Sequence, residues 1–479
     1  MVKQNLKSNS GYLLISALVF GSIGILMISA LTGWLITNWK AVTQLSDKEK
    51  AFQIAEAGIE YYRWHLAHDG QDFQDGTMTT GPYVHDFYDQ DGNLLGTYEL
   101  TITTSTSSSP VVTVLSRGHV ASSTVSRAIE VKLSRPSLAN YALVVNSNVR
   151  FGEGTETFGP IHSNGGIRFD GLAHNIVTSA KEKYDDPDHE GGDEFGVHTH
   201  LTTVDPVPPA LVPERTDVFE IGRYFPVPAI DFAGFTADMA NIKTASQSSG
   251  RYFGPSGQSG YNVILKTDRT FDLEKIDSID SPGGGCQNDL NQEGWGTWSI
   301  KKSTLVGNYP IPANGLIFLE DDVWVEGQIN NYRVTIVAAT FPETALTAKS
   351  ITVNKNLLYT NYDGRDATAL FAQKNINIGE NSENVIRLDA TLIAKNGRVG
   401  RYYYGPSCGT HNRQDITVYG MIATNQRYGF AYVDNLTGEL KSGYANRYII
   451  YDGNLLYNPP PYLPLATDNY QVISWRELR

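Results

Sequence analysis

The densest group of potential metal ligands in the chain lies between residues 185 and 200. It consists of Asp185, Asp186, Asp188, His189, Glu190, Asp193, Glu194, His198 and His200. A strand would place the imidazoles of His198 and His200 on one face, where binding of Zn²⁺ is geometrically possible. The candidate ligands are Asp188, His189, His198 and His200, with Ca²⁺ the milder option for the carboxylates. A solvated acidic loop is the alternative, because spacing fixes no third ligand, and no other cofactor is expected.

The chain has two cysteines, Cys286 and Cys408. In an exported protein they could pair and close a loop of about 120 residues, which the chain-entropy model values at about 4 to 5 kcal/mol. Two unpaired buried thiols are the alternative. Neither cysteine belongs to a Cys-x-x-Cys motif, and His411 near Cys408 stands alone, so the sequence indicates no redox or metal centre there.

Three adjacent carboxylates, Glu320, Asp321 and Asp322, are the remaining candidates for acid/base chemistry. Successive residues of a strand point to opposite faces, so these carboxylates do not converge as general acid/base catalysis requires. The sequence contains no Ser/His/Asp, Walker or nucleophile-elbow pattern. We therefore expect a protein that is not an enzyme.

Composition limits the partners. The net charge of −13 and the pI near 5.3 give no basic footprint for nucleic acid. Aromatic residues gather at 402–404 and 428–432, where they could form a stacking surface for sugars or be packed core. An unknown surface ligand, with glycan as an option, is therefore a candidate partner.

Most of the chain beyond residue 136 has a repeating β texture. Six segments share a polar residue, two apolar residues at i and i+2, and usually a closing Gly or Asn; they are 148–152, 166–171, 322–327, 350–354, 375–379 and 415–420. Short strands that end in sharp turns are typical of the rungs of a β-helix or similar solenoid. We predict first rungs over 137–178, an insertion or subdomain over 179–312 and a solenoid domain over 313–479. Irregular spacing leaves a β-sandwich as the alternative.

A small antiparallel β domain is predicted over 83–135. The Asp91-Gly92 pair is a hairpin signal between short alternating strands. Such a sheet needs an apolar partner face to share a core. A long N-terminal helix can supply this face, so the predicted fold class is mainly β with a long N-terminal helix.

That helix is predicted over 12–68. Residues 12–36 carry no charge and are long enough to span the hydrocarbon core, and residues 37–68 continue as an amphipathic helix. The apolar run is too long for the core of a signal peptide. Together the two parts make a rod of about 85 Å at 1.5 Å per residue.

Around the start of this helix lies the segment Asn9-Ser10-Gly11-Tyr12-Leu13-Leu14-Ile15, in which a short basic, polar peptide is followed by Gly and by an aromatic residue that opens the apolar helix. These residues resemble a type IV prepilin leader. The resemblance implies that residues 1–11 are a leader, which a prepilin peptidase removes on the cytoplasmic side between Gly11 and Tyr12.

The segment from Ala51 to Glu60 is similar to the motif that closes the N-terminal region of PilX-type minor pilins. The C-terminal part, with 314–318 and 322–327, resembles exported β-solenoid domains that accompany such N-termini. Major pilins carry Glu as the fifth residue of the mature chain, where this chain has Ser16. A buried carboxylate there needs a charged partner, so its absence favours a low-copy or tip subunit.

The resemblance implies a minor pilin-like subunit that assembles through its N-terminal helix and displays the β domain for adhesion or pilus assembly. Its partners would be other pilin subunits, the pilus assembly platform, the prepilin peptidase and the membrane. The N-terminus would lie in the cytoplasm and the β domain outside the cell. The alternative is an uncleaved anchor that carries an exported β-helix protein acting on or binding carbohydrate.

Overall fold

The computed structural model describes residues 10–70, 72–104, 111–134, 138–153, 155–232, 235–434, 439–464 and 470–478. These residues form two compact units. The first contains the described residues up to Thr104, from Val111 to Ser134 and from Tyr470 onward, and the second contains the described residues between 138 and 464. In sequence, the second unit is therefore inserted into the first. Residues 1–9 of the predicted leader lie outside the described part.

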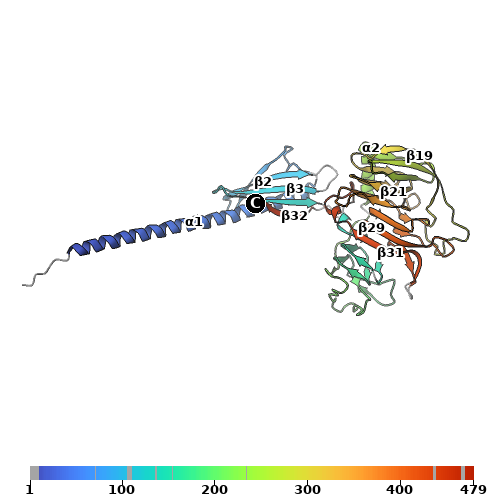
Figure 1. Cartoon of the computed structure of the whole chain (residues 1–479), viewed down its shortest axis with the longest axis horizontal. Coiled ribbons are helices and arrows are strands. Elements are labelled where there is room, and N and C mark those ends of the chain that lie inside the picture. Colours follow the sequence, from blue (N-terminus) through green and yellow to red (C-terminus); the bar gives the residue numbers. More distant parts are fainter. Residues whose placement is uncertain are drawn as a thin grey trace, which may run out of the picture. The chain divides into compact units, whose positions relative to one another are not determined.

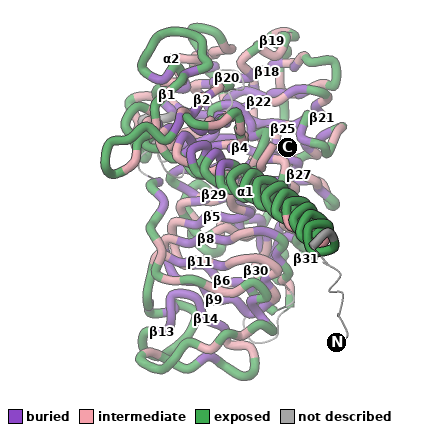
Figure 2. Tube along the Cα trace, turned by 90° about the vertical axis from the view of Figure 1, so that its left-hand side faces the viewer, coloured by how far each residue is buried: buried purple, intermediate pink, exposed green. Residues whose placement is uncertain are grey.

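The first unit begins with one continuous helix, α1 (Ser10–His68). It has no proline, and its 59 residues give a length of about 88 Å. The segment from residue 12 to 45 is exposed along almost its whole length (Figure 2). By length and composition, α1 is apolar enough to cross a membrane, with a mean hydropathy of 2.4 in its most apolar window. The prediction of one long N-terminal helix is confirmed.

The second half of α1 packs on a five-stranded antiparallel sheet (Figure 1). In spatial order its strands are β1 (Tyr83–Tyr88), β2 (Leu94–Thr104), β3 (Val111–Val120), β4 (Ser126–Ser134) and β32 (Gln471–Leu478). Helix and sheet share one apolar core. From the helix it takes Ala51, Ile54, Ala55, Ile59, Tyr62 and Leu66, which follow each other at steps of one, three or four residues.

The fifth strand corrects a predicted boundary. The sequence placed 313–479 in the solenoid, yet β32 pairs with β4, with Val472 opposite Leu133 and Trp475 opposite Val131. The Trp475 ring also lies 6.1 Å from the Phe52 ring of α1. The small sheet is therefore completed by a strand that follows the whole second unit.

The second unit is built largely of short parallel strands. Its first strands are β5 (Leu143–Val145), β6 (Val149–Phe151), β7 (Glu156–Thr157), β8 (Ile161–Ser163), β9 (Ile167–Phe169), β10 (Leu172–Ala173), β11 (Val177–Ser179), β12 (Lys183–Tyr184), β13 (Glu194–Phe195), β14 (Val197–His198) and β15 (Arg223–Tyr224). After α2 (Phe235–Ser249) come β16 (Arg251–Phe253), β17 (Tyr261–Leu265), β18 (Thr270–Ile279), β19 (Ile300–Pro310), β20 (Leu316–Leu319), β21 (Val323–Ile329), β22 (Arg333–Ala338), β23 (Ile351–Thr352) and β24 (Leu357–Tyr359). The last are β25 (Ala367–Ala372), β26 (Ile376–Ile378), β27 (Val385–Ala394), β28 (Val399–Arg401), β29 (Asn412–Thr424), β30 (Ala431–Val433) and β31 (Leu440–Tyr451).

The predicted motifs stack on one another in register. Val149 and Phe151 lie beside Ile167 and Phe169, and Ile351 lies beside Ile376. Stacked apolar side chains fill the interior as a continuous core. The pairing is parallel from rung to rung, whereas the sandwich alternative is built from antiparallel sheets. The prediction of mainly β structure after the helix is confirmed.

The chain enters this stack in its middle. β5 pairs with β8 on one side and with β29 on the other, so the first and last parts of the unit are neighbours (Figure 2). Two short 3-10 helices, η1 (Leu138–Asn140) and η2 (Gly453–Leu456), flank this joint, and the Leu138 N–H donates to the Pro464 carbonyl oxygen at 3.1 Å. The chain thus enters and leaves the second unit at adjacent points.

The predicted insertion over 179–312 is only partly separate from the stack. β16 pairs in parallel with β20, and β17 pairs in parallel with β21, so both belong to the rungs. The antiparallel strands β18 and β19 extend outward from β17. Prolines between residues 187 and 228 interrupt the pattern of short strands in the sequence, although the stack of strands continues beyond them. The sequence pattern therefore did not reveal that β16 and β17 belong to the stack.

Candidate functional site

The predicted assembly residues lie in the first turns of α1. Gly11 and Tyr12 follow Ser10, the first described residue of the helix. The Ser16 hydroxyl donates to the Tyr12 carbonyl oxygen at 2.9 Å. The hydroxyl is therefore satisfied within the helix and brings no charge to this position, where the side chain is partly buried.

Three of the four predicted metal ligands come together in the second unit. β12 and β13 form an antiparallel pair in which Tyr184 lies opposite Glu194, and their connecting loop carries His189. β14 stacks on β9, with His198 opposite Arg168, and His200 follows β14. The rings of His189 and His200 are 4.4 Å apart, and those of His198 and His200 are 5.0 Å apart.

Two buried carboxylates complete this histidine cluster. One oxygen of Glu194 lies 3.3 Å from a ring nitrogen of both His189 and His200. Asp186 Oδ2 lies 3.5 Å from His198 Nε2. Asp186, His198 and His200 form one group whose potential ligand atoms all lie within 4.8 Å of one another, and His189, Glu194 and His200 form a second.

Asp188 is not part of this cluster. Its carboxylate accepts a hydrogen bond from Arg427 at 2.7 Å. The sequence therefore selected the wrong acidic residue of the loop for the groups that the structure brings together. Asp186 and Glu194 were in the acidic run, but their selection depends on the β12–β13 pairing, which has no motif of its own.

Charges around the cluster favour the forms that bind cations. Burial raises the pKa of Asp186, but His198, the Asp188 backbone N–H and Arg168 lower it to about 2. Burial, followed by the charge of Arg168, lowers the pKa of His200. Near neutral pH, Asp186 is therefore an anion.

The two cysteines form a disulfide that joins residues 122 positions apart. It packs with buried Tyr402 and Tyr404 and with the partly buried Trp295 and Trp298. The aromatic run at 402–404 therefore contributes two packed core residues rather than an open stacking surface. Trp295 Nε1 also donates to the Tyr403 carbonyl oxygen at 2.9 Å, so the loop 286–298 is held to the loop 402–408.

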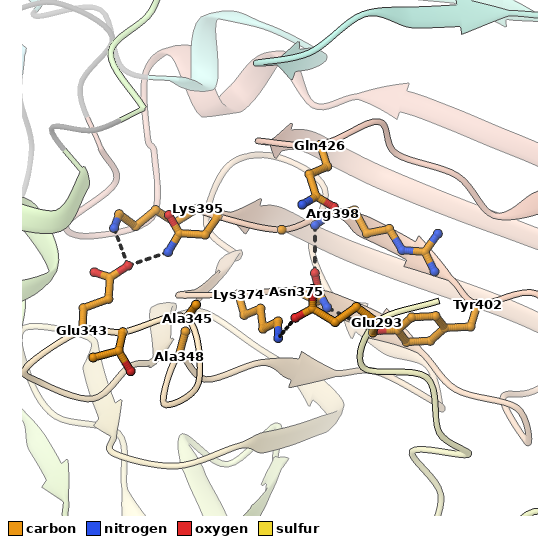
Figure 3. Close-up of a pocket in the computed structure, with 13 residues that line it drawn as sticks. Glu293, Glu343, Ala345, Ala348, Lys374, Asn375, Lys395, Arg398, Tyr402 and Gln426 are labelled. Carbon is orange, nitrogen blue, oxygen red and sulfur yellow. Dashed lines mark hydrogen bonds and ion pairs between the residues drawn. The ribbon is translucent and has the colours of Figure 1, made fainter. Parts of the chain in front are cut away.

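Beside this disulfide lies a pocket of about 610 Å³ (Figure 3). It is lined by Glu293, Glu343, Thr344, Ala345, Ala348, Lys374, Asn375, Lys395, Asn396, Gly397, Arg398, Tyr402 and Gln426. Lys374 pairs with Glu293 at 2.9 Å, and Lys395 pairs with Glu343 at 2.6 Å. The pocket therefore presents amides and paired charges of both signs.

The carboxylates at 320–322 have separate partners. Glu320 accepts from Tyr252 at 2.7 Å, Asp321 accepts from the Ser256 hydroxyl at 2.6 Å, and Asp322 accepts from the Ser350 N–H at 2.7 Å. Burial raises the pKa of Asp322. These three residues hold neighbouring segments together and do not converge on a shared site.

No protein-family model and no curated protein matches the chain. Among solved structures, it is similar to the competence-associated pilin ComZ from Thermus thermophilus, with 13% identity and a TM-score of 0.29. The match covers 90% of this chain and 98% of that one.

Proposed function

We propose that this protein is a minor pilin-like subunit that assembles through α1 and displays its second unit outside the cell. One observation carries the proposal: α1 is a single helix with two different halves. Its first half is exposed over residues 12–45 and carries no charge over residues 12–36, while Ala51, Ala55 and Tyr62 of the second half are fully buried against the sheet. A helix exposed in this way needs an apolar environment, first the membrane and then the core of a filament.

The topology supports a display role. The second unit enters and leaves at adjacent points, marked by the contact between Leu138 and Pro464. A large unit with neighbouring ends can be inserted between β4 and β32 while the small sheet keeps its pairing. The subunit can then carry a bulky domain and keep an intact base for assembly.

The uncharged residue Ser16, near the start of α1, supports a role as a low-copy subunit of a filament. Ser16 is neutral and bonds to its own helix, so it needs no partner charge in hydrocarbon. A carboxylate at this position would need a cationic partner in every neighbouring subunit. We therefore place the protein at the tip or at rare positions of a filament, with other pilin subunits and the assembly platform as its partners.

The pocket is the proposed site of an external ligand, and its chemistry fits a saccharide. Its volume is within the usual range for small-molecule sites, about 300 to 1,000 Å³. Asn396 and Gln426 offer amides, and Lys374 and Glu293 offer charged groups, which together can donate to and accept from hydroxyls. The protein would act by binding and would not transform this ligand.

The N-terminus of the mature chain tests the assembly proposal. The full chain would be produced in a bacterial host with and without a prepilin peptidase, and the N-terminal peptide identified by mass spectrometry. We expect a chain that starts at Tyr12 only when the peptidase is present, and Gly11→Val should block cleavage whereas Gly21→Val should not. A chain that keeps Met1 under all conditions would favour the uncleaved anchor.

Binding to a glycan array tests the pocket separately. Ala348→Trp would fill the pocket and should abolish binding of the full chain. Leu346→Trp is the matched control, because Leu346 lies in the same loop, is 98% exposed and does not line the pocket. Equal glycan binding by both variants would contradict the proposal that the pocket binds a saccharide. It would not affect the proposed role in filament assembly.

A further inference from the structure

Two buried polar atoms in the histidine cluster face each other without a hydrogen bond between them. The His198 ring nitrogen Nδ1 lies 3.2 Å from the Phe195 carbonyl oxygen. Because a carbonyl oxygen only accepts, Nδ1 carries the hydrogen, and in the neutral imidazole Nε2 then has a free lone pair. That Nε2 lies 3.5 Å from the Asp186 carboxylate oxygen Oδ2.

Both atoms are buried and lack hydrogen-bond partners in the described structure. The His198 side chain is 0% exposed and that of Asp186 is 3% exposed. Leaving two acceptors buried and unpaired costs about 1 to 3 kcal/mol for each group. A cation placed between them would satisfy both atoms at once.

The separation favours a metal ion over a proton. A charge-assisted N–H···O bond is normally about 2.7 to 2.9 Å long, shorter than the distance observed. Two ligands of tetrahedral Zn²⁺, with bonds of about 2.0 to 2.1 Å, are about 3.3 to 3.4 Å apart. The observed 3.5 Å is close to that value. The hydrogen bond from Nδ1 to a backbone carbonyl is also the usual way to orient a metal-binding histidine.

We infer that Asp186, His198 and His200 bind one Zn²⁺ ion. One potential ligand atom from each lies within 4.8 Å of the others. Two imidazole nitrogens favour Zn²⁺ over Ca²⁺, which prefers oxygen ligands alone. Glu194, 3.3 Å from His200 Nε2, is a positioning residue that also contacts His189.

The surrounding charges are compatible with a cation. The Arg168 guanidinium lies 3.7 Å from Asp186, but its closer partner is Asp170 at 2.6 Å. Arg150 lies 3.8 Å from the same Asp170 oxygen, so the three carboxylates of Asp170, Asp186 and Glu194 face two guanidinium groups. The ion would join the β12–β13 hairpin to β14, so its role is structural. This inference is independent of whether α1 assembles into a filament.

The test uses the full chain in detergent, treated with a chelator and titrated with ZnCl₂ or CaCl₂ by calorimetry. We expect one Zn²⁺ per chain and no saturable Ca²⁺ binding. Asp186→Asn and His200→Ala should each weaken Zn²⁺ binding by about tenfold or more. The matched control is Asp188→Asn, in the same loop, whose carboxylate faces Arg427 and which should bind Zn²⁺ as the parent does.

Two further measurements separate lost ligands from lost folding. Zn²⁺ should raise the thermal midpoint of the parent and of Asp188→Asn but not that of Asp186→Asn, and circular dichroism should show all three folded. Co²⁺ bound at the inferred position should give the visible spectrum of a tetrahedral site. We expect this spectrum in the parent. Absence of stoichiometric Zn²⁺ binding, or Zn²⁺ binding unchanged in both ligand variants, would overturn the inference, as would a preference for Ca²⁺.

Discussion

Gly118 of β3 lies directly against Ala51 of α1. A Cβ atom added to Gly118 would stand 2.1 Å from the Ala51 carbonyl oxygen and 2.6 Å from the Ala55 nitrogen. Farther along the helix, a Cβ on Gly58 would stand 2.4 Å from the Ser116 hydroxyl. The small residues of the segment 51–60 therefore form a seam with β3, where the backbones of helix and sheet approach each other.

Gly118→Ala should loosen this seam. The added methyl group meets backbone atoms, which cannot turn away, so we expect a loss of about 1 to 3 kcal/mol or more in the stability of the first unit. Hydrogen exchange measured by mass spectrometry on the full chain in detergent should rise over 48–66 and 111–120. Gly33→Ala is the control, because a Cβ there has no atom within 4 Å. Unchanged exchange in Gly118→Ala would show that the seam is less tight.

The elements that the sequence predicted well are those whose apolar residues repeat over short distances in the chain, namely α1 and the short-strand motifs. The apolar steps of α1 and the motifs at 148–152 and 166–171 repeat within a few residues or between successive rungs, and the structure stacks those two motifs in register. Ala51, Ala55 and Gly58 were recognised as a motif, but their purpose depends on Gly118, which lies 67 residues after Ala51 and has no sequence signal of its own.

Long-range pairing was beyond the sequence patterns. β32 is a short alternating strand whose partner β4 lies more than 300 residues earlier, and nothing in its composition distinguishes it from a rung. The prediction of Asp188 in place of Asp186 as a candidate ligand has the same origin. Neighbouring carboxylates in a loop differ only in the direction that the folded backbone gives them, and the sequence does not show that direction.

Loss of the disulfide should destabilise the second unit. The Cys286–Cys408 bond closes a loop of about 120 residues, so Cys286→Ser with Cys408→Ser should cost about 2 to 5 kcal/mol. Denaturant unfolding of the full chain, with and without reductant, measures this difference. Because Glu293 and Tyr402 of the joined loops line the pocket, any glycan binding should weaken in parallel. A double variant as stable as the parent would contradict the expected constraint.

His162 should make the second unit less stable in mild acid. Its ring nitrogens lie 3.0 Å from Thr178 Oγ1 and Asn164 Oδ1, and burial lowers its pKa, partly offset by the bond with Asn164. Between the unfolded pKa of about 6.5 and the lower folded pKa, the unfolded chain binds the extra proton, so stability falls as pH decreases through this window. Thermal midpoints of metal-free protein across this range should fall more steeply for the parent than for His162→Gln.

His174 gives a contrast of opposite sign. It is near the surface, and its hydrogen bond with Glu220 raises its pKa. The folded chain therefore binds the extra proton first, and this contribution to stability is present at low pH and lost as pH rises through the folded pKa. His174→Gln should thus lower the thermal midpoint in mild acid relative to the parent. Identical pH profiles for the His162→Gln and His174→Gln variants would contradict both assignments.

Deletion of residues 471–478 should disturb the first unit and spare the second. β32 covers the edge of β4, Arg476 pairs with Glu130 at 2.8 Å, and Trp475 packs near Phe52. Without this strand the backbone of β4 is left as an open, partly apolar edge, which favours faster exchange and association between chains. Hydrogen exchange should therefore rise across 126–134 and the adjoining face of α1, while the rungs of the second unit keep their protection.

Trp475→Ala should produce a smaller change at the same positions, because it removes the Phe52 contact and leaves the backbone pairing intact. Protection of 126–134 that survives the deletion would mean that β4 does not depend on β32.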